Sequence, residues 1–142
     1  MTAKKQKPIE KRIFSGNRKT AVAKLRLTPG KGKVFYNHLD SENLGLFHKL
    51  ALAEPIRIHN QEMGEEIKYD FHIKTQSGGK QAQIQAARLA IARAILEITG
   101  SDTLRKVYIA YDRNMIVPDS RRKETRKPGD SKARAKRQKS FR

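Results

Sequence analysis

The sequence contains no cysteine, which excludes a disulfide framework and any zinc site built on thiolates. No apolar run approaches the length that crosses a bilayer, and the first residues lack the hydrophobic core of a secretion signal. A chain of 142 residues has the length of one domain that buries a hydrophobic core. We therefore expect a soluble intracellular protein of one domain, without contact to a membrane.

Motifs that support catalysis are also missing. The four histidines, His38, His48, His59 and His72, have no pair with the spacing of zinc ligands. The sequence Gly78-Gly79-Lys80 is similar to a phosphate-binding loop, but it lacks the longer glycine-rich frame of a nucleotide-triphosphate site. We predict that the protein is not an enzyme and uses no metal or cofactor. A helix that starts here can still hold a phosphate of an RNA backbone, because its first N–H groups are free.

Negative charge is scarce at the two ends of the chain. The formal charge is +18 in total. Residues 1–33 contain eleven Lys and Arg with one acid, and residues 119–142 contain eleven with three acids. The 85 residues between them contain ten of each sign. Two strongly basic ends on a neutral body favour a polyanionic partner, and nucleic acid is the commonest polyanion.

Apolar residues nearly vanish from Pro118 onward, so this tail cannot bury enough apolar surface to fold alone. With RNA present, its arginines can bind phosphates through two N–H groups, and Phe141 can pack on a base or sugar. We predict a basic disordered arm at residues 1–8, a globular RNA-binding domain at residues 9–117 and an extended basic tail at residues 118–142.

The strongest helix signal runs from Gln81 to Thr99. Its apolar residues recur at spacings of three and four, which predicts one buried stripe: Ile84, Ala87, Ile91, Ala94, Ile95 and Ile98. Glycines precede this helix, and Gly100 follows it as a left-handed cap.

The remaining elements alternate between strands and short helices. Strands are predicted at residues 11–15, 21–27, 33–37 and 67–74, with a turn at residues 16–20 and a hairpin closed by residues 29–32. Helices are predicted at residues 39–53, ended by Pro55, and behind Ser101 as the N-cap. This order predicts an α+β domain with helices packed on one face of a small sheet.

Several stretches resemble one known family. They are F-S-G-N-R-K-T-A-V-A-K-L-R-L-T-P-G-K-G at residues 14–32, G-G-K-Q-A-Q-I-Q-A-A-R-L-A-I-A-R-A-I-L at 78–96, D-R-N-M-I-V-P-D-S-R-R-K-E-T-R-K at 112–127 and K-R-Q-K-S-F-R at 136–142. In their order and spacing they are similar to small-subunit ribosomal protein nine. The ending K-S-F-R and the stretch Y-D-R-N-M-I-V are similar to archaeal and eukaryotic members.

The resemblance implies a fold like the second domain of ribosomal protein five, with a left-handed β-α-β crossover. It implies a cytoplasmic protein of the small-subunit head that neighbours other head proteins. Its implied rRNA-binding residues are Arg18, Lys19, Arg121, Arg122, Lys123, Arg126, Lys127, Arg134, Lys136 and Arg137. The tail would end at the anticodon stem-loop of the peptidyl-site tRNA, with Arg142 on a phosphate beside Lys139, Ser140 and Phe141.

Two other classes stay open on the residues alone. A freestanding chromatin-like protein or RNA chaperone would share the basic ends, and it would exist as a monomer outside particles. A small-molecule kinase can share a related fold, but it requires a phosphate loop and a catalytic acid that the sequence does not offer.

Overall fold

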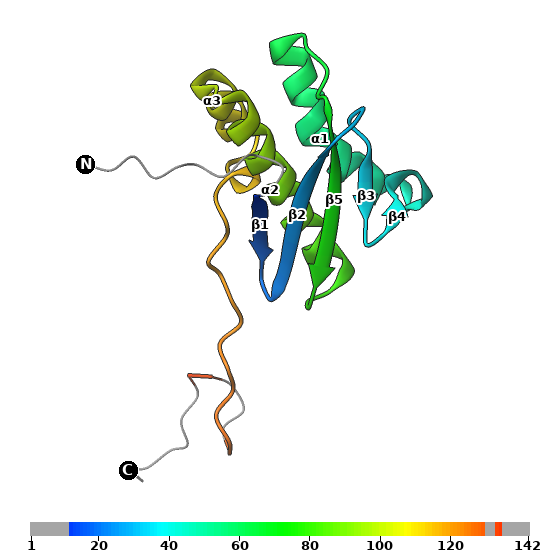
Figure 1. The fold of residues 1–142 in the computed structure, drawn as a ribbon. Helices are drawn as coiled ribbons and strands as arrows, with labels where there is room; N and C mark the ends of the chain where they lie inside the picture. The colour runs from blue at the N-terminus through cyan, green and yellow to red at the C-terminus, as the bar shows by residue number, and fades with distance from the viewer. Residues whose placement is uncertain (1–11, 130–132, 135–142) are drawn as a thin grey trace, which may run out of the picture.

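The structure is a computed structural model that describes residues 12–129 and 133–134. It contains a five-stranded sheet in the order β1-β2-β5-β3-β4. The strands are β1 (Ile13–Arg18), β2 (Ala21–Pro29), β3 (Val34–Tyr36), β4 (Leu39–Asp40) and β5 (Tyr69–Gln76). The helices are α1 (Leu46–Met63), α2 (Lys80–Thr99) and α3 (Asp102–Tyr111), with the 3-10 turns η2 (Ser41–Asn43) and η3 (Arg113–Met115). Helices lie on one side of the sheet (Figure 1), which confirms the α+β prediction.

Helix α2 forms the centre of the core. Five of the six residues of its predicted stripe are buried and Ile98 is half-buried, but burial extends beyond the stripe to Ala86, Leu89, Ala90 and Ala92. Ala86, Ala90 and Ala94 are fully buried, and Gly100 ends the helix at a φ of 60°. Small side chains let the sheet approach closely: a Cβ on Gly16 of β1 would lie 2.1 Å from the carbonyl oxygen of Ala86. Glycine at this position therefore fixes how tightly β1 packs on α2.

The two faces of the sheet differ in character. Along β2, Ala23, Leu25 and Leu27 point into the core, whereas Lys24 and Arg26 are exposed. This alternation has the two-residue period of a half-buried strand. The helices cover only the apolar face, so the polar face of β1, β2 and β5 stays open (Figure 1).

The predicted turn at residues 16–20 is wrong in extent. Strand β1 continues to Arg18, and the turn to β2 is Lys19-Thr20 alone, with Lys19 at a φ of 54°. Gly16 is typical of a turn residue in the sequence, but it pairs with Ala23 inside the strand. Its role is the close contact with α2.

The predicted hairpin between the second and third strands is also wrong. Strand β3 pairs in parallel with β5, on the other side of β5 from β2. Asp70 explains the crossing, because its Oδ1 accepts hydrogen bonds from the amides of Lys31 and Lys33, both at 2.9 Å. The loop at residues 30–33 therefore passes over the start of β5 and delivers the chain to its far edge.

The helix predicted at residues 39–53 begins and ends later. Residues 39–43 form β4 and η2, and α1 runs from Leu46 to Met63 with Pro55 inside it. Pro55 removes one helical hydrogen bond. The helix continues because Leu52, Ile58 and Pro55 itself are buried against the core.

The last strand and helix agree with the prediction apart from the strand bounds. Strand β5 begins at Tyr69 rather than Ile67, which is buried just before it. Helix α3 starts behind Ser101, whose hydroxyl accepts a hydrogen bond from the amide of Leu104 at 3.3 Å. The predicted N-cap is confirmed.

Candidate nucleic-acid interface

The N-terminus of α2 lies at the same end of the sheet as the β1–β2 turn. The loop before α2 contains Ser77 and Gly78 at φ values of 59° and 70°. A Cβ on Gly78 would come within 2.8 Å of the Ala21 Cβ, so this loop packs on the first residue of β2. The first turn of α2 contains no acid and has no side-chain cap. Free N–H groups and the nearby Lys19 give this end a positive potential suited to a phosphate.

Arg18 sits at the end of β1 and contacts two other segments. Its Nε donates a hydrogen bond to Gln85 Oε1 of α2 at 2.9 Å, and its Nη1 forms an ion pair with Asp119. The Arg18 side chain is 22% exposed. In this structure the guanidinium therefore holds the start of the C-terminal segment against β1 and α2.

Asp119 receives a second cation from its own segment. The amide of Arg121 donates to Asp119 Oδ1 at 2.9 Å, and the Arg121 Nη2 lies 2.8 Å from Oδ2. Hydrogen bonds from Arg121, and then from Arg18, hold the pKa of Asp119 well below its usual value. The carboxylate therefore keeps its charge and fixes the direction in which the chain leaves the domain.

The C-terminal segment beyond η3 runs away from the body as an extended chain (Figure 1). Within the described residues, four predicted rRNA-binding cations of this segment are exposed and have no ion-pair partner: Arg122, Lys123, Arg126 and Lys127. Arg134 pairs with Glu124 at 2.7 Å and lowers the pKa of that carboxyl. The predicted site residues Lys136, Arg137, Lys139, Ser140, Phe141 and Arg142 lie outside the described residues.

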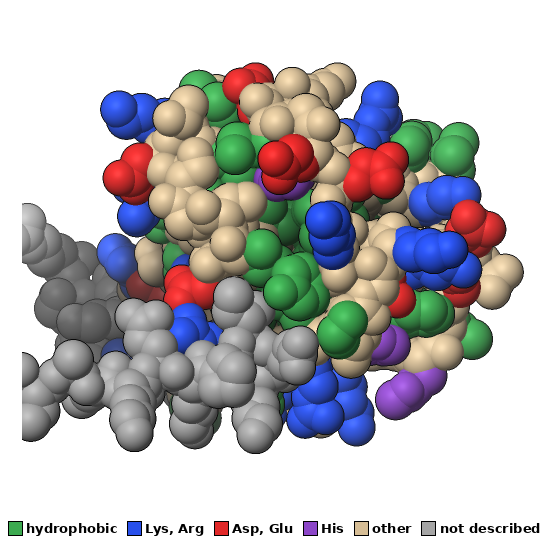
Figure 2. Space-filling model, turned by 45° about the horizontal axis from the view of Figure 1, so that its top comes forward, with side chains coloured by type: hydrophobic (Ala, Val, Ile, Leu, Met, Phe, Trp, Pro, Cys, Tyr) green, Lys and Arg blue, Asp and Glu red, His purple; other side chains and the backbone are tan. Residues whose placement is uncertain are grey.

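The body contains one group of half-buried charges that are paired with one another. Arg88 of α2 lies 2.7 Å from Asp112, which directly follows α3, and 2.5 Å from Glu54 of α1. Burial raises the pKa of Asp112, but hydrogen bonds from Arg88 and Asn114 outweigh it and bring the pKa below its usual value. In the view of Figure 2, acids and cations are interspersed over the surface of the body.

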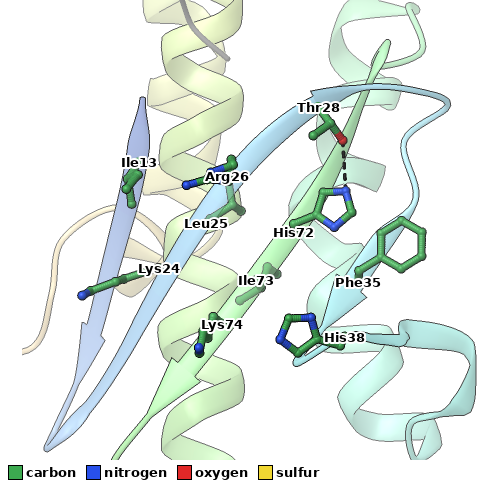
Figure 3. A pocket seen from close by; sticks show the side chains of 10 residues that line it. All are labelled: Ile13, Lys24, Leu25, Arg26, Thr28, Phe35, His38, His72, Ile73 and Lys74. Carbon is green, nitrogen blue, oxygen red and sulfur yellow. Dashed lines mark hydrogen bonds between the residues drawn. The ribbon is translucent and has the colours of Figure 1, made fainter. Parts of the chain in front are cut away.

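The open face of the sheet is a basic surface that sequence reasoning missed. Lys24 and Arg26 of β2 and Lys74 of β5 point to this face, together with His72 and Phe35 (Figure 3). They line an open concavity of about 500 Å³. The signal was present in the sequence, because the alternation of these two strands puts Lys24, Arg26 and Lys74 on the side opposite the apolar residues.

The histidines have separate surroundings. His59 is buried and contacts Asn60, whereas His72 stacks on Phe35. No three His, Cys, Asp or Glu side chains are grouped for a metal ion within residues 12–129 and 133–134. In the same part of the chain, no helix is long and apolar enough to cross a membrane.

The fold and the charges define a small α+β domain that carries a strongly cationic C-terminal extension. The chain belongs to the family described as ribosomal protein S9/S16, whose model matches residues 16–142. It is 40% identical over 131 residues to the small ribosomal subunit protein uS9 of Saccharolobus solfataricus, covering 92% of this chain and 94% of that protein. It is 37% identical over 130 residues to the protein of the same name from Methanococcus vannielii, covering 89% and 95%.

These comparisons confirm the resemblance to the family, and the relatives named here are archaeal, in line with the expected likeness to archaeal and eukaryotic members. Proteins of this family are structural rather than catalytic, so the chain is not an enzyme.

Proposed function

We propose that the protein is a structural constituent of the small ribosomal subunit in the cytoplasm, where it binds rRNA of the subunit head beside other head proteins. The observation that supports this most directly is the row of exposed cations without an ion-pair partner on the described part of the extension. Family membership supplies the particle. In this proposal residues 1–8 are a basic arm, residues 9–117 are the rRNA-binding domain and residues 118–142 are the extended tail.

The rRNA contacts are assigned to two places. Lys19 and the α2 N-terminus lie at one end of the sheet, where a phosphate can bind to free N–H groups. Arg122, Lys123, Arg126 and Lys127 line the extension and can neutralise successive phosphates. Arg18 and Arg121 form ion pairs with Asp119 in the free protein. Each can bind an RNA phosphate either in place of this carboxylate or in addition to it. Arg134, Lys136 and Arg137 continue the same basic segment.

The fold proposed here is that of the second domain of ribosomal protein five, with a left-handed crossover. Strands β3 and β5 are parallel neighbours joined through α1. In Figure 1 both strands run downward, α1 lies behind the sheet, and the chain moves from β3 on the right to β5 on the left. This path is the reverse of the usual right-handed connection, which supports the assignment.

The end of the tail is proposed to contact the anticodon stem-loop of the peptidyl-site tRNA. Arg142 would bind a phosphate through two N–H groups, with Lys139, Ser140 and Phe141 beside it. The resemblance of K-S-F-R to the family ending supports this role. The extended course of the segment away from the domain gives the tail the reach that a second RNA partner requires (Figure 1).

Deletion of residues 139–142 tests the proposal in purified small subunits titrated with tRNA at fixed magnesium and salt. We expect assembly to stay nearly intact and peptidyl-site tRNA to bind about tenfold more weakly, the size of one charged hydrogen bond. Arg142→Ala should reproduce much of the loss. Arg142→Lys should lose less, because lysine keeps the charge without the planar fork. Arg134→Ala, upstream in the tail, is the matched control.

Unchanged tRNA affinity would leave the tail with rRNA alone. In that case rRNA affinity would fall slightly, and the salt dependence would flatten by about 0.7–0.9 for each phosphate that the protein no longer neutralises. Protein that sediments as a free monomer in lysate would favour a freestanding RNA chaperone. Nucleoside-triphosphate binding in calorimetry would favour the kinase alternative.

A further inference from the structure

We propose that the open face of the sheet is a second RNA-binding surface, which takes an unpaired nucleotide on the stacked pair Phe35–His72 and the flanking phosphates on Arg26, Lys24 and Lys74. This surface lies on the body, apart from the extension and from the α2 N-terminus to which the rRNA contacts are assigned above. We name these five residues the sheet-face site.

The stacked pair is held in place before any partner binds. The Phe35 and His72 ring centroids are 4.8 Å apart, and the two planes differ by 7°. His72 Nε2 also lies 3.0 Å from the hydroxyl of Thr28, so the imidazole contacts a neighbouring strand on each side. A rigid aromatic surface on a strand is what a base stacks on, because every base has a π-face.

The cations stand on the strands beside the pair. In the sheet register Arg26 is the cross-strand partner of His72, and Lys24 is the partner of Lys74. Figure 3 shows Lys24, Arg26 and Lys74 toward one side of the concavity and the rings of Phe35, His72 and His38 toward the other. A nucleotide with its base on the rings therefore has cations within reach of its own and its neighbour's phosphate.

The charges of the site favour RNA over a protein partner. None of the ten residues that line the concavity is acidic. Lys24, Arg26 and Lys74 have no ion-pair partner among the described residues. Like charges on adjacent strands repel each other. A phosphate backbone removes that repulsion, whereas a neutral protein surface would leave it.

The site favours an unpaired nucleotide over a duplex. Proteins read RNA mainly where bases are unstacked, because the grooves of an A-form helix do not present a base face. The Phe35–His72 pair can add to the binding affinity only for an RNA strand that has a base free to stack. The cations would bind either form.

The test compares full-length variants for binding to a short oligouridine and to an RNA duplex at physiological ionic strength. Phe35→Leu keeps an apolar side chain and removes the ring, and Phe35→Tyr restores a ring. The matched control is Phe47→Leu on α1, whose side chain is 83% exposed and lies away from the sheet-face site. Thermal unfolding of each variant verifies that it is folded.

We expect Phe35→Leu to weaken oligouridine binding about fivefold or more, with the duplex affinity and the salt dependence unchanged. Phe35→Tyr and Phe47→Leu should bind as the parent does. Arg26→Gln should weaken the binding of both RNAs and lower the slope of log affinity against log salt by about 0.7 on the single strand. Arg105→Gln on α3, outside the sheet-face site, should cause a smaller loss of affinity and a smaller change of slope. A strand containing 2-aminopurine should lose fluorescence on binding to the parent and retain it with Phe35→Leu.

If Phe35→Leu lost the same affinity for the single strand and for the duplex, the proposal would be overturned, because the surface would then bind RNA through its charge without base stacking. Unchanged RNA binding by Phe35→Leu would also overturn it. If that variant then entered small subunits poorly, the face would bind a neighbouring protein. Tail deletion leaves the sheet-face site untouched, so failure of this test and failure of the tRNA proposal are distinguishable.

Discussion

Arg18 and Asp119 form an ion pair between residues that lie 101 positions apart in the sequence. The pair joins the end of β1 to the segment that follows Pro118, and Arg121 binds the same carboxylate. The body thereby determines where the basic extension starts and in which direction it leaves. An arginine that the family resemblance assigns to rRNA thus has a structural task in the free protein.

Asp119→Asn should release the start of the extension. The neutral amide loses the charge that attracts both arginines, and the Arg121 amide loses its charged acceptor at 2.9 Å. We expect hydrogen exchange of the Arg121 amide to become several-fold faster while amides within α2 keep their rates.

Two further variants define the effect. Arg18→Gln should accelerate the Arg121 amide less, because Arg121 keeps its own carboxylate partner. Glu42→Gln, an exposed acid in η2, should change neither rate. Equal exchange in parent and Asp119→Asn would show that the ion pair does not hold the segment.

Sequence periodicity predicted the elements whose burial is repetitive. Helix α2 repeats apolar residues at spacings of three and four, and the central residues of β2 and β5 alternate between buried and exposed, so each pattern indicates one type of element. The closing glycine and the Ser101 cap follow local rules of helix ends and were predictable for that reason.

Periodicity could not predict the position or length of elements that depend on tertiary contacts. The position of β3 depends on Asp70, which binds a loop almost forty residues earlier in the chain. The continuation of α1 through Pro55 depends on burial, which outweighs the absence of one hydrogen bond. For the site, composition revealed the basic ends, but only the register of β2, β5 and β3 brings Arg26, His72 and Phe35 into one row.

Gly16→Ala should destabilise the domain strongly. The added Cβ would lie 2.1 Å from the Ala86 oxygen and 2.9 Å from the Ala90 nitrogen, both of them backbone atoms that cannot turn aside. The clash must separate β1 from α2, which should lower the free energy of unfolding by about 1–3 kcal/mol or more. Urea denaturation measures this free energy. Gly45→Ala, where no atom lies within 4 Å, should cost about 1 kcal/mol at most, and a similar midpoint for both variants would contradict the close packing.

Ile91→Asp should prevent stable folding or cost about 3 kcal/mol or more, because it places an unpaired carboxylate in a fully buried position. Arg93→Ala, two residues along, should be milder but measurable. Its guanidinium donates to the carbonyls of Ser15 at 2.9 Å and Ile116 at 3.2 Å, so about 1–2 kcal/mol is expected. Arg105→Ala on the exposed side of α3 should have almost no effect. Circular dichroism during urea denaturation orders the three, and equal stability would mean that the buried face of α2 is wrongly assigned.

Tyr108 makes the free energy of unfolding of the domain depend on pH in the alkaline range. Its hydroxyl is buried and donates to the Pro55 carbonyl at 2.7 Å. Burial raises the pKa of Tyr108 well above the usual value of a tyrosine. Above pH 10 or so the unfolded chain loses this proton while the folded chain retains it, so the stability that the phenol contributes declines as pH rises.

Tyr108→Phe separates the hydrogen bond from the titration. At neutral pH the variant should be about 1 kcal/mol less stable, because the bond to Pro55 is lost and the ring is kept. Between about pH 10 and 11 its free energy of unfolding should fall less steeply than that of the parent, since phenylalanine has no proton to lose. Lysines titrate over the same interval in both proteins, so the difference between the two urea-denaturation series isolates Tyr108. Parallel curves across that interval would mean that the hydroxyl reaches solvent and is not held between α3 and α1.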